Sequence, residues 1–186
     1  MTNEELVTNL LINLGLDITN RNLVDTPKRF CKVLEQFAGF GIDFESEYKK
    51  LSEAVFPHDG ENMITANAIK VYSLCPHHLL PVQFSVSIAY LPHGWVIGLS
   101  KLARFAKLCA RRLDLQEDYT RNLGLTLQDW LKTKDVAVLV KGKHMCMEMR
   151  GVEVSCEIVT SEVLGAFRKD PSVRNEFHRL ISNGKS

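Results

Sequence analysis

The chain has 186 residues, enough for one globular domain that buries roughly 70% of its unfolded surface without disulfides. Hydrophobic residues make up 45% of the sequence and charged residues 24%, so the composition excludes a disordered chain. The net charge is +1, from 23 Lys and Arg against 22 Asp and Glu. A chain this close to neutrality is not expected to coat nucleic acid or an anionic membrane. An anionic ligand would therefore have to bind at a local cluster of positive charge.

The N-terminus and the cysteines indicate the compartment. The segment MTNEELVTNLLINLG is acidic, whereas a signal peptide begins with basic residues. No apolar run approaches the roughly 18 to 20 residues of a membrane span, which predicts a cytoplasmic protein without a membrane partner. The odd number of widely spaced cysteines favours reduced thiols or metal ligands over disulfides. We expect core packing for three of them, Cys31, Cys109 and Cys156.

Two amphipathic helices are expected in the first 45 residues. Thr2 and Glu5 have the spacing of a capping box, and leucines follow at helical intervals. In the second segment Thr26 is a candidate N-cap and Pro27 occupies the first helical position. An apolar stripe then continues to the AGFG break. These patterns predict an N-terminal helical part over 1–45.

From residue 63 the apolar pattern changes from a helical period to the alternation of a strand. The alternation is cleanest in PVQFSVSIAYL (81–91). Helices are expected next, at 100–112 and at 114–133, the second opened by the box Asp114-x-x-Glu117. The other expected elements are strands at 63–72, 136–146 and 152–158 and a closing helix from Asp170-Pro171.

The order of these elements predicts the fold class. Two strand pairs joined by hairpins alternate with helix pairs, which favours an α+β architecture with an antiparallel sheet and helices on one face. The sequence contains neither a repeat nor a linker. We therefore expect a single domain over 1–186.

The densest polar cluster has the residue types of a zinc site. Cys75-Pro76-His77-His78 lies between two expected strands, and His144-Met145-Cys146 ends a third. A Cys-x-x-His pair plus a distant Cys is a set of zinc ligands, and side chains two apart on a strand face a common side. Three protein ligands would leave a position for water, whose pKa a catalytic zinc lowers to about 7. The alternative is that the cysteines are core residues and the histidines strand-end residues with ordinary hydrogen bonds.

Two further clusters favour binding of an anion and of a polar ring. Ser100 is a candidate helix cap, and backbone N–H groups at a helix N-terminus favour an anion. Positive charges that could hold a polyphosphate lie on this helix and on the second helix of the chain: Lys101, Arg104, Lys107, Lys28, Arg29 and Lys32. The alternative is a solvated basic face. Gln116-Glu117 opens another helix, where a carboxylate can simply complement the dipole.

Taken together, these segments resemble the GTP cyclohydrolase I family. The resemblance covers most of the chain and depends on several motifs in order. They are NLVDTPKRFCK, CPHHLLP, VIGLSKLARFAKLCARRL, LQEDYT, KHMCMEMRG, LGAF and the closing Arg-x-Glu-Phe at 174–177. Several ordered motifs at family-like spacings are far more specific than any one of them.

The resemblance implies a role for each cluster. Zinc, one ion per protomer, is held by Cys75, His78 and Cys146, while His77 and His144 transfer protons. Glu117, supported by Gln116, binds the guanine ring. A carboxylate can accept from both N1–H and the 2-amino group of guanine, whereas adenine has neither. The positions around the triphosphate and ribose are Ser100, Lys101, Arg104, Arg150, Arg29 and Lys32.

The resemblance also implies an activity and an assembly. The family enzyme hydrolyses the imidazole ring of GTP, releases formate and rearranges the remainder to 7,8-dihydroneopterin triphosphate. Its fold is the tunnelling fold, here over 60–186. The protomers close their sheets into a ring-forming oligomer, generally a decamer, with active sites between neighbouring subunits. The sequence leaves open whether the pterin product feeds folate, biopterin or deazapurine synthesis.

One position departs from the family pattern. The family usually has Glu between the zinc-binding Cys and the His pair, and this chain has Pro76. Residues that orient metal ligands can matter roughly 10- to 100-fold, which keeps two alternatives open. One is an altered relative that stops at the ring-opened formamidopyrimidine or uses another purine. The other is a zinc- or nucleotide-binding oligomer without catalysis.

Overall fold

The computed structural model describes residues 1–183, which fall into two compact units with the boundary between Ile42 and Asp43. The boundary lies close to the end of the helical part expected over 1–45. We describe each unit separately.

The first unit is a pair of helices, α1 (Asn3–Asn13) and α2 (Thr26–Ala38). The capping box predicted at Thr2 and Glu5 is confirmed, because each residue's side chain accepts a hydrogen bond from the other's backbone N–H. Helix α2 begins one residue earlier than expected: its N-cap is Asp25 rather than Thr26. Cys31 of α2 is buried, as predicted.

The second unit is built on a four-stranded antiparallel sheet with the strand order β2-β3-β5-β6. Its strands are β2 (Ile64–Leu74), β3 (Pro81–Tyr90), β5 (Val136–His144) and β6 (Ile158–Val163). Two short strands, β1 (Val55–Pro57) and β4 (Trp95–Ile97), form a separate antiparallel pair. The antiparallel α+β architecture expected from the sequence is confirmed.

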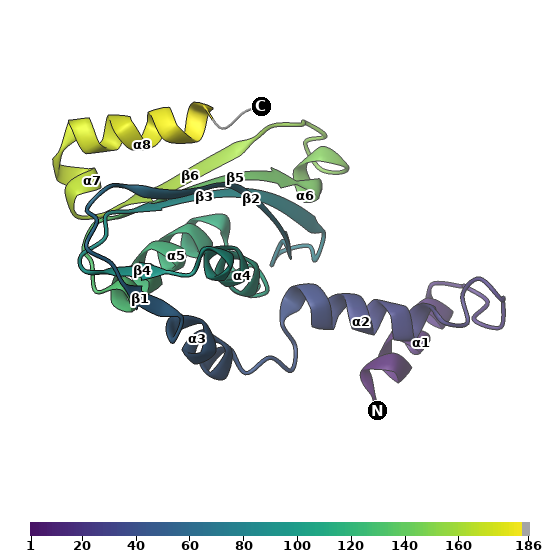
Figure 1. The fold of residues 1–186 in the computed structure, drawn as a ribbon. Coiled ribbons are helices and arrows are strands. Elements are labelled where there is room, and N and C mark those ends of the chain that lie inside the picture. The colour runs from purple at the N-terminus through teal and green to yellow at the C-terminus, as the bar shows by residue number, and fades with distance from the viewer. Residues whose placement is uncertain (184–186) are drawn as a thin grey trace. The chain divides into compact units, whose positions relative to one another are not determined.

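Helices cover both faces of this sheet (Figure 1). On one face lie α4 (Leu99–Cys109) and α5 (Gln116–Leu131), where Phe84 of β3 stacks on Tyr119 with ring centroids 4.9 Å apart. On the other face α7 (Ala166–Lys169) and α8 (Pro171–Asn183) bury Phe167 and Phe177 against the sheet. The expectation that helices cover only one face of the sheet was therefore wrong, because the sequence pattern does not reveal which face α8 covers.

The alternating segment 152–158 does not form the expected strand. Residues 152–157 have no regular structure, Val152 is 66% exposed, and β6 begins only at Ile158. Ile158 pairs with Gly142, and in the same register residues 152–155 would face 145–148, which form α6 rather than a strand. Apolar alternation without a neighbouring strand is not sufficient to form a strand.

Other differences concern short elements and caps. The sequence patterns did not predict α3 (Phe44–Ser52), β1, β4, α6 (Met145–Glu148) or α7. Gly98 rather than Ser100 is the N-cap of α4, and Leu115 rather than Asp114 is that of α5; neither makes a side-chain cap bond. Packing of α4 and α5 on the sheet sets where they begin, so the cap pattern did not decide it.

Candidate metal centre

The loop between β2 and β3 brings Cys75 and His78 together. The carbonyl oxygen of Cys75 accepts from the N–H groups of His78 (3.3 Å) and Leu79 (2.8 Å), which makes one helical turn. The Cys75 N–H donates to the Leu80 carbonyl at 2.9 Å and closes the loop. Pro76 is the first residue inside this turn, where a missing N–H costs nothing. The turn places the Cys75 Sγ 3.6 Å from the His78 Nδ1.

The third cysteine reaches this loop from β5. Val82, which follows the loop, pairs with His144 at the end of β5, and the chain then turns into the short helix α6 that carries Cys146. The expectation that His144 and Cys146 both lie on one strand was wrong, because the strand ends at His144. The turn into α6 nevertheless brings the candidate ligand atoms of Cys75, His78 and Cys146 within 4.8 Å of one another.

The donor set fits zinc. Tetrahedral zinc with Zn–S bonds of about 2.3 Å and Zn–N bonds of about 2.0–2.1 Å separates a sulfur from a nitrogen ligand by about 3.6 Å. The distance between Cys75 Sγ and His78 Nδ1 has this value. Two thiolates and one imidazole are soft and borderline ligands, which zinc prefers and magnesium does not. Among residues 1–183 this is the group of three such side chains close enough to share an ion.

These three residues line a cavity of about 390 Å³ together with the other predicted reactive groups. His77, His144, Gln116 and Glu117 line the same cavity. The cavity has an apolar floor, since Phe84 and Val82 of β3 also line it. The structure thus brings seven of the predicted site residues together from three segments: the β2–β3 loop, the start of α5, and the end of β5 with α6.

Gln116 is buried next to His144. Its side chain is 4% exposed, and the two hydrogens of its Nε2 are shared among three acceptors, the carbonyl oxygens of Val140 (3.2 Å) and Ile158 (3.0 Å) and the Thr160 hydroxyl (3.1 Å). Its Oε1 lies 2.8 Å from the His144 Nε2. Every polar atom of this amide is therefore bonded to the protein.

Burial and charge act on the ionisable groups of the cavity. Burial lowers the pKa of His144, and the Glu117 carboxylate acts in the opposite direction. Burial and the neighbouring Cys75 thiol raise the pKa of the Cys146 thiol. A cation bound between the two sulfurs would reverse that shift, because metal ligation requires the thiolate.

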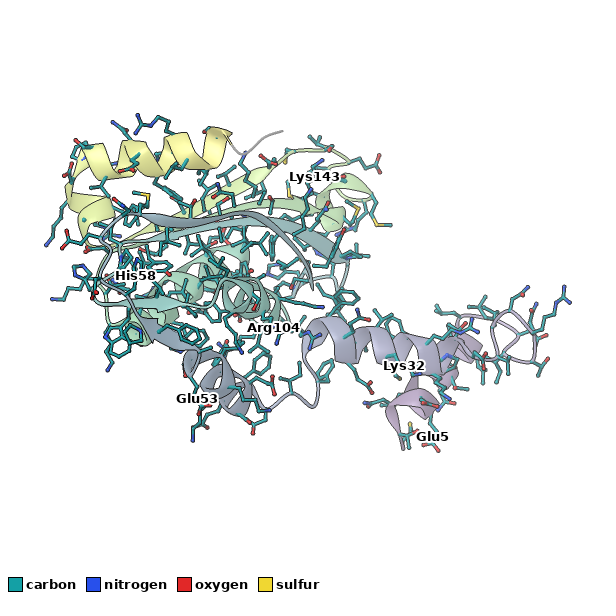
Figure 2. All side chains as sticks on the ribbon, viewed as in Figure 1. Glu5, Lys32, Glu53, His58, Arg104 and Lys143 are labelled. Atoms are coloured by element: carbon teal, nitrogen blue, oxygen red, sulfur yellow. The ribbon has the colours of Figure 1, made fainter. Side chains whose placement is uncertain are left out.

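The predicted phosphate-binding residues lie elsewhere. Lys101 and Arg104 line a separate groove of about 360 Å³ on α3 and α4, with Lys50, Lys107 and Arg111; Arg104 is labelled in Figure 2. Ser100 is an exposed residue in the first turn of α4, and Arg150 is exposed just after α6. The remaining two, Arg29 and Lys32, lie on α2 in the other unit, where Arg29 pairs with Asp25 at 2.9 Å.

Sequence reasoning missed two threonines of the site. The Thr160 hydroxyl of β6 accepts from the Gln116 side-chain amide, the Thr120 hydroxyl of α5 donates to the Gln116 backbone carbonyl, and the two hydroxyls contact each other. Both lie on amphipathic elements, where a threonine carries no signal that separates it from ordinary packing. Only the register of β6 against β5 and the contact of α5 with the sheet bring them beneath the cavity.

Fold and site together define an α+β protein with a Cys-His-Cys group that could hold a metal ion, beside two histidines and a carboxylate. The sequence profile of the family described as GTP cyclohydrolase I matches residues 3–182. The chain belongs to the GTP cyclohydrolase I family, which is a family of enzymes.

Curated relatives agree over nearly the whole length. "GTP cyclohydrolase 1" of Methylococcus capsulatus is 43% identical over 179 residues, with 96% of each chain covered. "GTP cyclohydrolase 1" of Alkalilimnicola ehrlichii is 44% identical over 174 residues, with 92% of each covered. Among solved structures, the apo form of the archaeosine synthase QueF-Like matches 56% of this chain and 96% of its own at 21% identity, with a TM-score of 0.45.

No helix in the described part of the chain combines the length and the apolarity needed to cross a membrane.

Proposed function

We propose that this protein is a zinc-dependent GTP cyclohydrolase I that converts GTP and one net water to 7,8-dihydroneopterin triphosphate and formate. The observation that carries the proposal is the convergence of Cys75, His78 and Cys146, with ligand atoms within 4.8 Å, in one cavity with His77, His144 and Glu117. Family membership supplies the substrate class.

The proposed metal site uses the three converging ligands, with one zinc per protomer. When bound, zinc supplies a Lewis acid that lowers the pKa of a coordinated water to about 7. Because Cys75 and His78 belong to a single closed turn, their relative position is fixed by backbone hydrogen bonds and not by side-chain packing alone.

The other cavity residues are proposed to bind and to transfer protons. The Glu117 carboxylate, exposed at the start of α5, would accept from N1–H and the 2-amino group of guanine and so hold the purine in the cavity. His77, whose Nδ1 lies 3.9 Å from Cys75 Sγ, and His144 would move protons as C–N bonds of the imidazole ring break. An imidazole side chain can both donate and accept a proton in the neutral pH range.

The triphosphate is proposed to be held by basic residues of a neighbouring copy. A triphosphate requires a cationic cradle, whereas Lys101 and Arg104 line a different groove from the metal ligands of their own chain. Strands β2 and β6 are the two edges of the sheet over residues 1–183, and an unpaired edge is a template for a strand of another chain. Both observations support a ring-forming homo-oligomer, such as a decamer, with active sites between subunits. Arg29, Lys32, Ser100 and Arg150 are proposed to complete the cradle.

The activity is tested by incubating purified zinc-loaded protein with GTP and with ATP. Formate release and the mass and fluorescence of the pterin product are measured. The proposal is supported if GTP yields both formate and dihydroneopterin triphosphate and ATP yields neither. A ring-opened formamidopyrimidine as the final product, turnover of another purine, or tight GTP binding without formate would each replace it with one of the alternatives.

Shared active sites are tested by complementation. Cys75→Ser lacks a proposed metal ligand and Arg104→Ala lacks a proposed phosphate contact, so each is expected to be inactive alone. If one site takes these residues from two chains, oligomers assembled from both variants contain some intact sites and regain part of the activity. Mixtures that stay inactive although light scattering shows mixed oligomers would argue that each chain completes its own site.

A further inference from the structure

The donor and the acceptor of each hydrogen bond around Gln116 can be assigned, and the series of bonds ends at His144. The fixed end is the backbone carbonyl oxygen of Gln116, which can only accept. It accepts from the Thr120 hydroxyl at 2.7 Å. A hydroxyl has one hydrogen to donate, so the Thr120 hydroxyl has no further hydrogen for its second neighbour.

The second neighbour of Thr120 is Thr160. The two hydroxyl oxygens lie 2.6 Å apart, and because the hydrogen of Thr120 is already used, Thr160 must be the donor. Thr160 in turn has no hydrogen left for Gln116, so it must accept at the 3.1 Å contact with the Gln116 side chain. The Gln116 group that faces Thr160 is therefore the NH₂ group.

Two independent contacts give the same amide orientation. The carbonyl oxygens of Val140 and Ile158 lie 3.2 and 3.0 Å from this same NH₂ group, and carbonyl oxygens only accept. A flipped amide would place its oxygen against two carbonyl oxygens and against the Thr160 hydroxyl, whose hydrogen is already donated to Thr120. Because Gln116 is only 4% exposed, this would leave buried polar groups unpaired, which is unfavourable.

The orientation of Gln116 decides which nitrogen of His144 carries the hydrogen. Gln116 Oε1 lies 2.8 Å from His144 Nε2, and an amide oxygen only accepts, so Nε2 must be the donor. A neutral imidazole has a single N–H, which leaves Nδ1 as the nitrogen with a free lone pair. Within residues 1–183 no protein group is hydrogen-bonded to this Nδ1.

Gly142 of β5 keeps room for this contact. A Cβ at position 142 would collide with Gln116 Oε1 and would lie 3.0 Å from His144 Nε2. The point where the amide and the imidazole meet therefore depends on the absence of a side chain on the strand between them.

We propose that Gln116, whose side-chain NH₂ group is oriented by the Val140 and Ile158 carbonyls and by Thr160, is a positioning residue that holds His144 as the Nε2–H tautomer, so that Nδ1 is the atom that exchanges protons in the reaction. The inference rests on the proposed function for its catalytic part. In turnover Nδ1 accepts one proton and gives one back, while Gln116 Oε1 accepts from Nε2–H throughout, so the imidazole is unchanged at the end. Gln116 then serves His144 with its side chain rather than contacting guanine with it.

The tautomer is measured without reference to activity. Solid-state NMR of zinc-loaded protein with ¹⁵N-labelled histidine at pH 8, above the ordinary imidazole pKa near 6.5, reports which ring nitrogen is protonated. The His144 signals are identified by their loss in His144→Gln. A protonated Nε2 and an unprotonated Nδ1 are expected, and the reverse assignment would overturn the proposal even in a fully active enzyme.

Variants of Gln116 test the link to catalysis. Gln116→Met keeps the length of the side chain but removes the amide, and we expect a mixture of His144 tautomers, a kcat about 10- to 100-fold lower and little change in KM for GTP. The matched control is Thr160→Val, in which the Val140 and Ile158 carbonyls still accept from the Gln116 NH₂ group, so the His144 tautomer should be retained. Unchanged kcat and unchanged tautomer in Gln116→Met would remove Gln116 from this role.

Gly142→Ala provides a second route, since it displaces Gln116 Oε1 without altering Thr160, Gln116 or His144. The same loss of the Nε2–H signal and the same fall in kcat are expected with zinc retained. If the wild-type enzyme proves inactive while its His144 has the expected tautomer, the proposed function fails and the positioning network stands. If the wild-type enzyme is active but its His144 has the opposite tautomer, the proposed function stands and the positioning network fails.

Discussion

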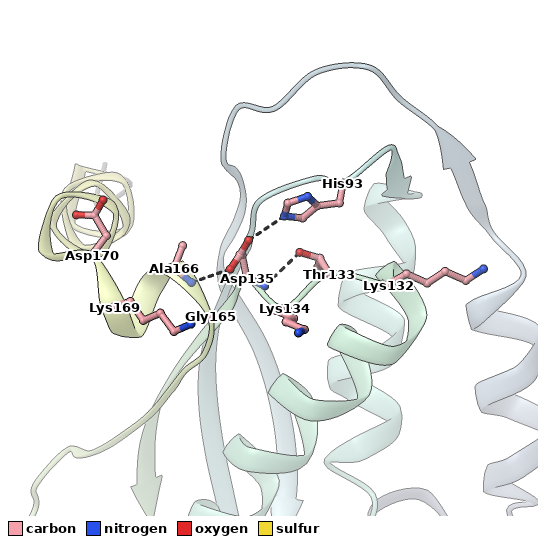
Figure 3. A pocket seen from close by; sticks show the side chains of 9 residues that line it. All are labelled: His93, Lys132, Thr133, Lys134, Asp135, Gly165, Ala166, Lys169 and Asp170. Atoms are coloured by element: carbon pink, nitrogen blue, oxygen red, sulfur yellow. Dashed lines mark hydrogen bonds and ion pairs between the residues drawn. The ribbon is translucent and has the colours of Figure 1, made fainter.

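His93 and Asp135 join two loops at one end of the sheet: His93 Nε2 donates to a carboxylate oxygen of Asp135 at 2.8 Å. The other oxygen of Asp135 accepts from the Ala166 N–H at 2.6 Å (Figure 3). His93 precedes β4, Asp135 precedes β5 and Ala166 begins α7. One carboxylate thereby connects three segments that are far apart in sequence.

This carboxylate predicts an acid-sensitive contribution to stability. Burial by itself raises the pKa of Asp135, but the hydrogen bonds from His93 and Ala166 outweigh it, and the pKa lies below its ordinary value. The folded state therefore binds this proton more weakly than the unfolded state does. The contribution is complete above the unfolded pKa of about 3.9 and is lost as the pH falls through the lower folded pKa.

The measurement is urea unfolding of Asp135→Asn against the wild type at one protein concentration. At pH 7 the variant should be about 1.5 to 3 kcal/mol less stable, the range for hydrogen bonds to charged groups, and the difference should shrink towards pH 3. Asp59→Asn, at an exposed carboxylate, is the control and should change stability by less than about 0.5 kcal/mol. A difference that is independent of pH would show that the charge of Asp135 is not responsible.

Zinc binding should depend on Cys75 and Cys146. Cys75→Ser and Cys146→Ser each remove a thiolate from the proposed set, so we expect loss of zinc by elemental analysis with circular dichroism largely unchanged. Cys156→Ser is the control, because Cys156 is half-buried and lies outside the group that converges. Full zinc occupancy in both ligand variants would take these residues off the list of ligands.

The two proposed proton-transfer histidines should be separable from metal binding. His77→Ala and His144→Ala are expected to retain zinc while kcat falls roughly 10²- to 10⁴-fold, and the ring-opened intermediate should accumulate in product analysis by mass spectrometry. His58→Ala, at an exposed histidine outside the cavity, should leave the rate unchanged. Wild-type rates in both cavity variants would end the assignment.

Glu117 should determine the choice of guanine. Glu117→Ala leaves the two donors of the base without an acceptor, which costs about 1 to 3 kcal/mol for each buried group, so GTP turnover should be lost while zinc stays bound. Asp118→Ala is the matched control, since Asp118 is also exposed in the first turn of α5 but does not line the cavity. An unaltered preference for GTP over ATP in Glu117→Ala would contradict the role.

Pro76 is expected to be compatible with activity. It lies at the first position of the turn that joins Cys75 to His78, where its fixed φ near −65° stiffens the backbone. Pro76→Glu should therefore change kcat or its pH optimum without abolishing turnover, and zinc occupancy should stay full. An inert wild type together with an active Pro76→Glu would indicate that this chain has lost the reaction and would favour the binding-only alternative.

The sequence by itself determined the elements that repeat one period over many residues. The alternation in 81–91 predicted β3, and the helical stripes predicted α1, α2, α4 and α5, because burial of one face enforces that period locally. The motifs also identified the chemistry of the metal cluster, since Cys and His at these spacings have few other uses. Family membership could likewise be inferred from ordered motifs before any coordinates.

Only the tertiary structure decided where the candidate metal ligands come together and which residues hold the neighbouring groups in position. Cys146 reaches the loop of Cys75 because β5 ends at His144 and turns into α6, whereas the sequence pattern extended the strand through Cys146. Segment 152–157 alternates like a strand but does not form one, because most of it would face residues 145–148, which form α6, and strand formation needs a neighbour. Thr120, Thr160 and Gln116 meet only through the packing of α5 and the register of β6 on β5. Hydrogen-bond direction between residues 40 positions apart is a property of that packing and leaves no periodic trace in the chain.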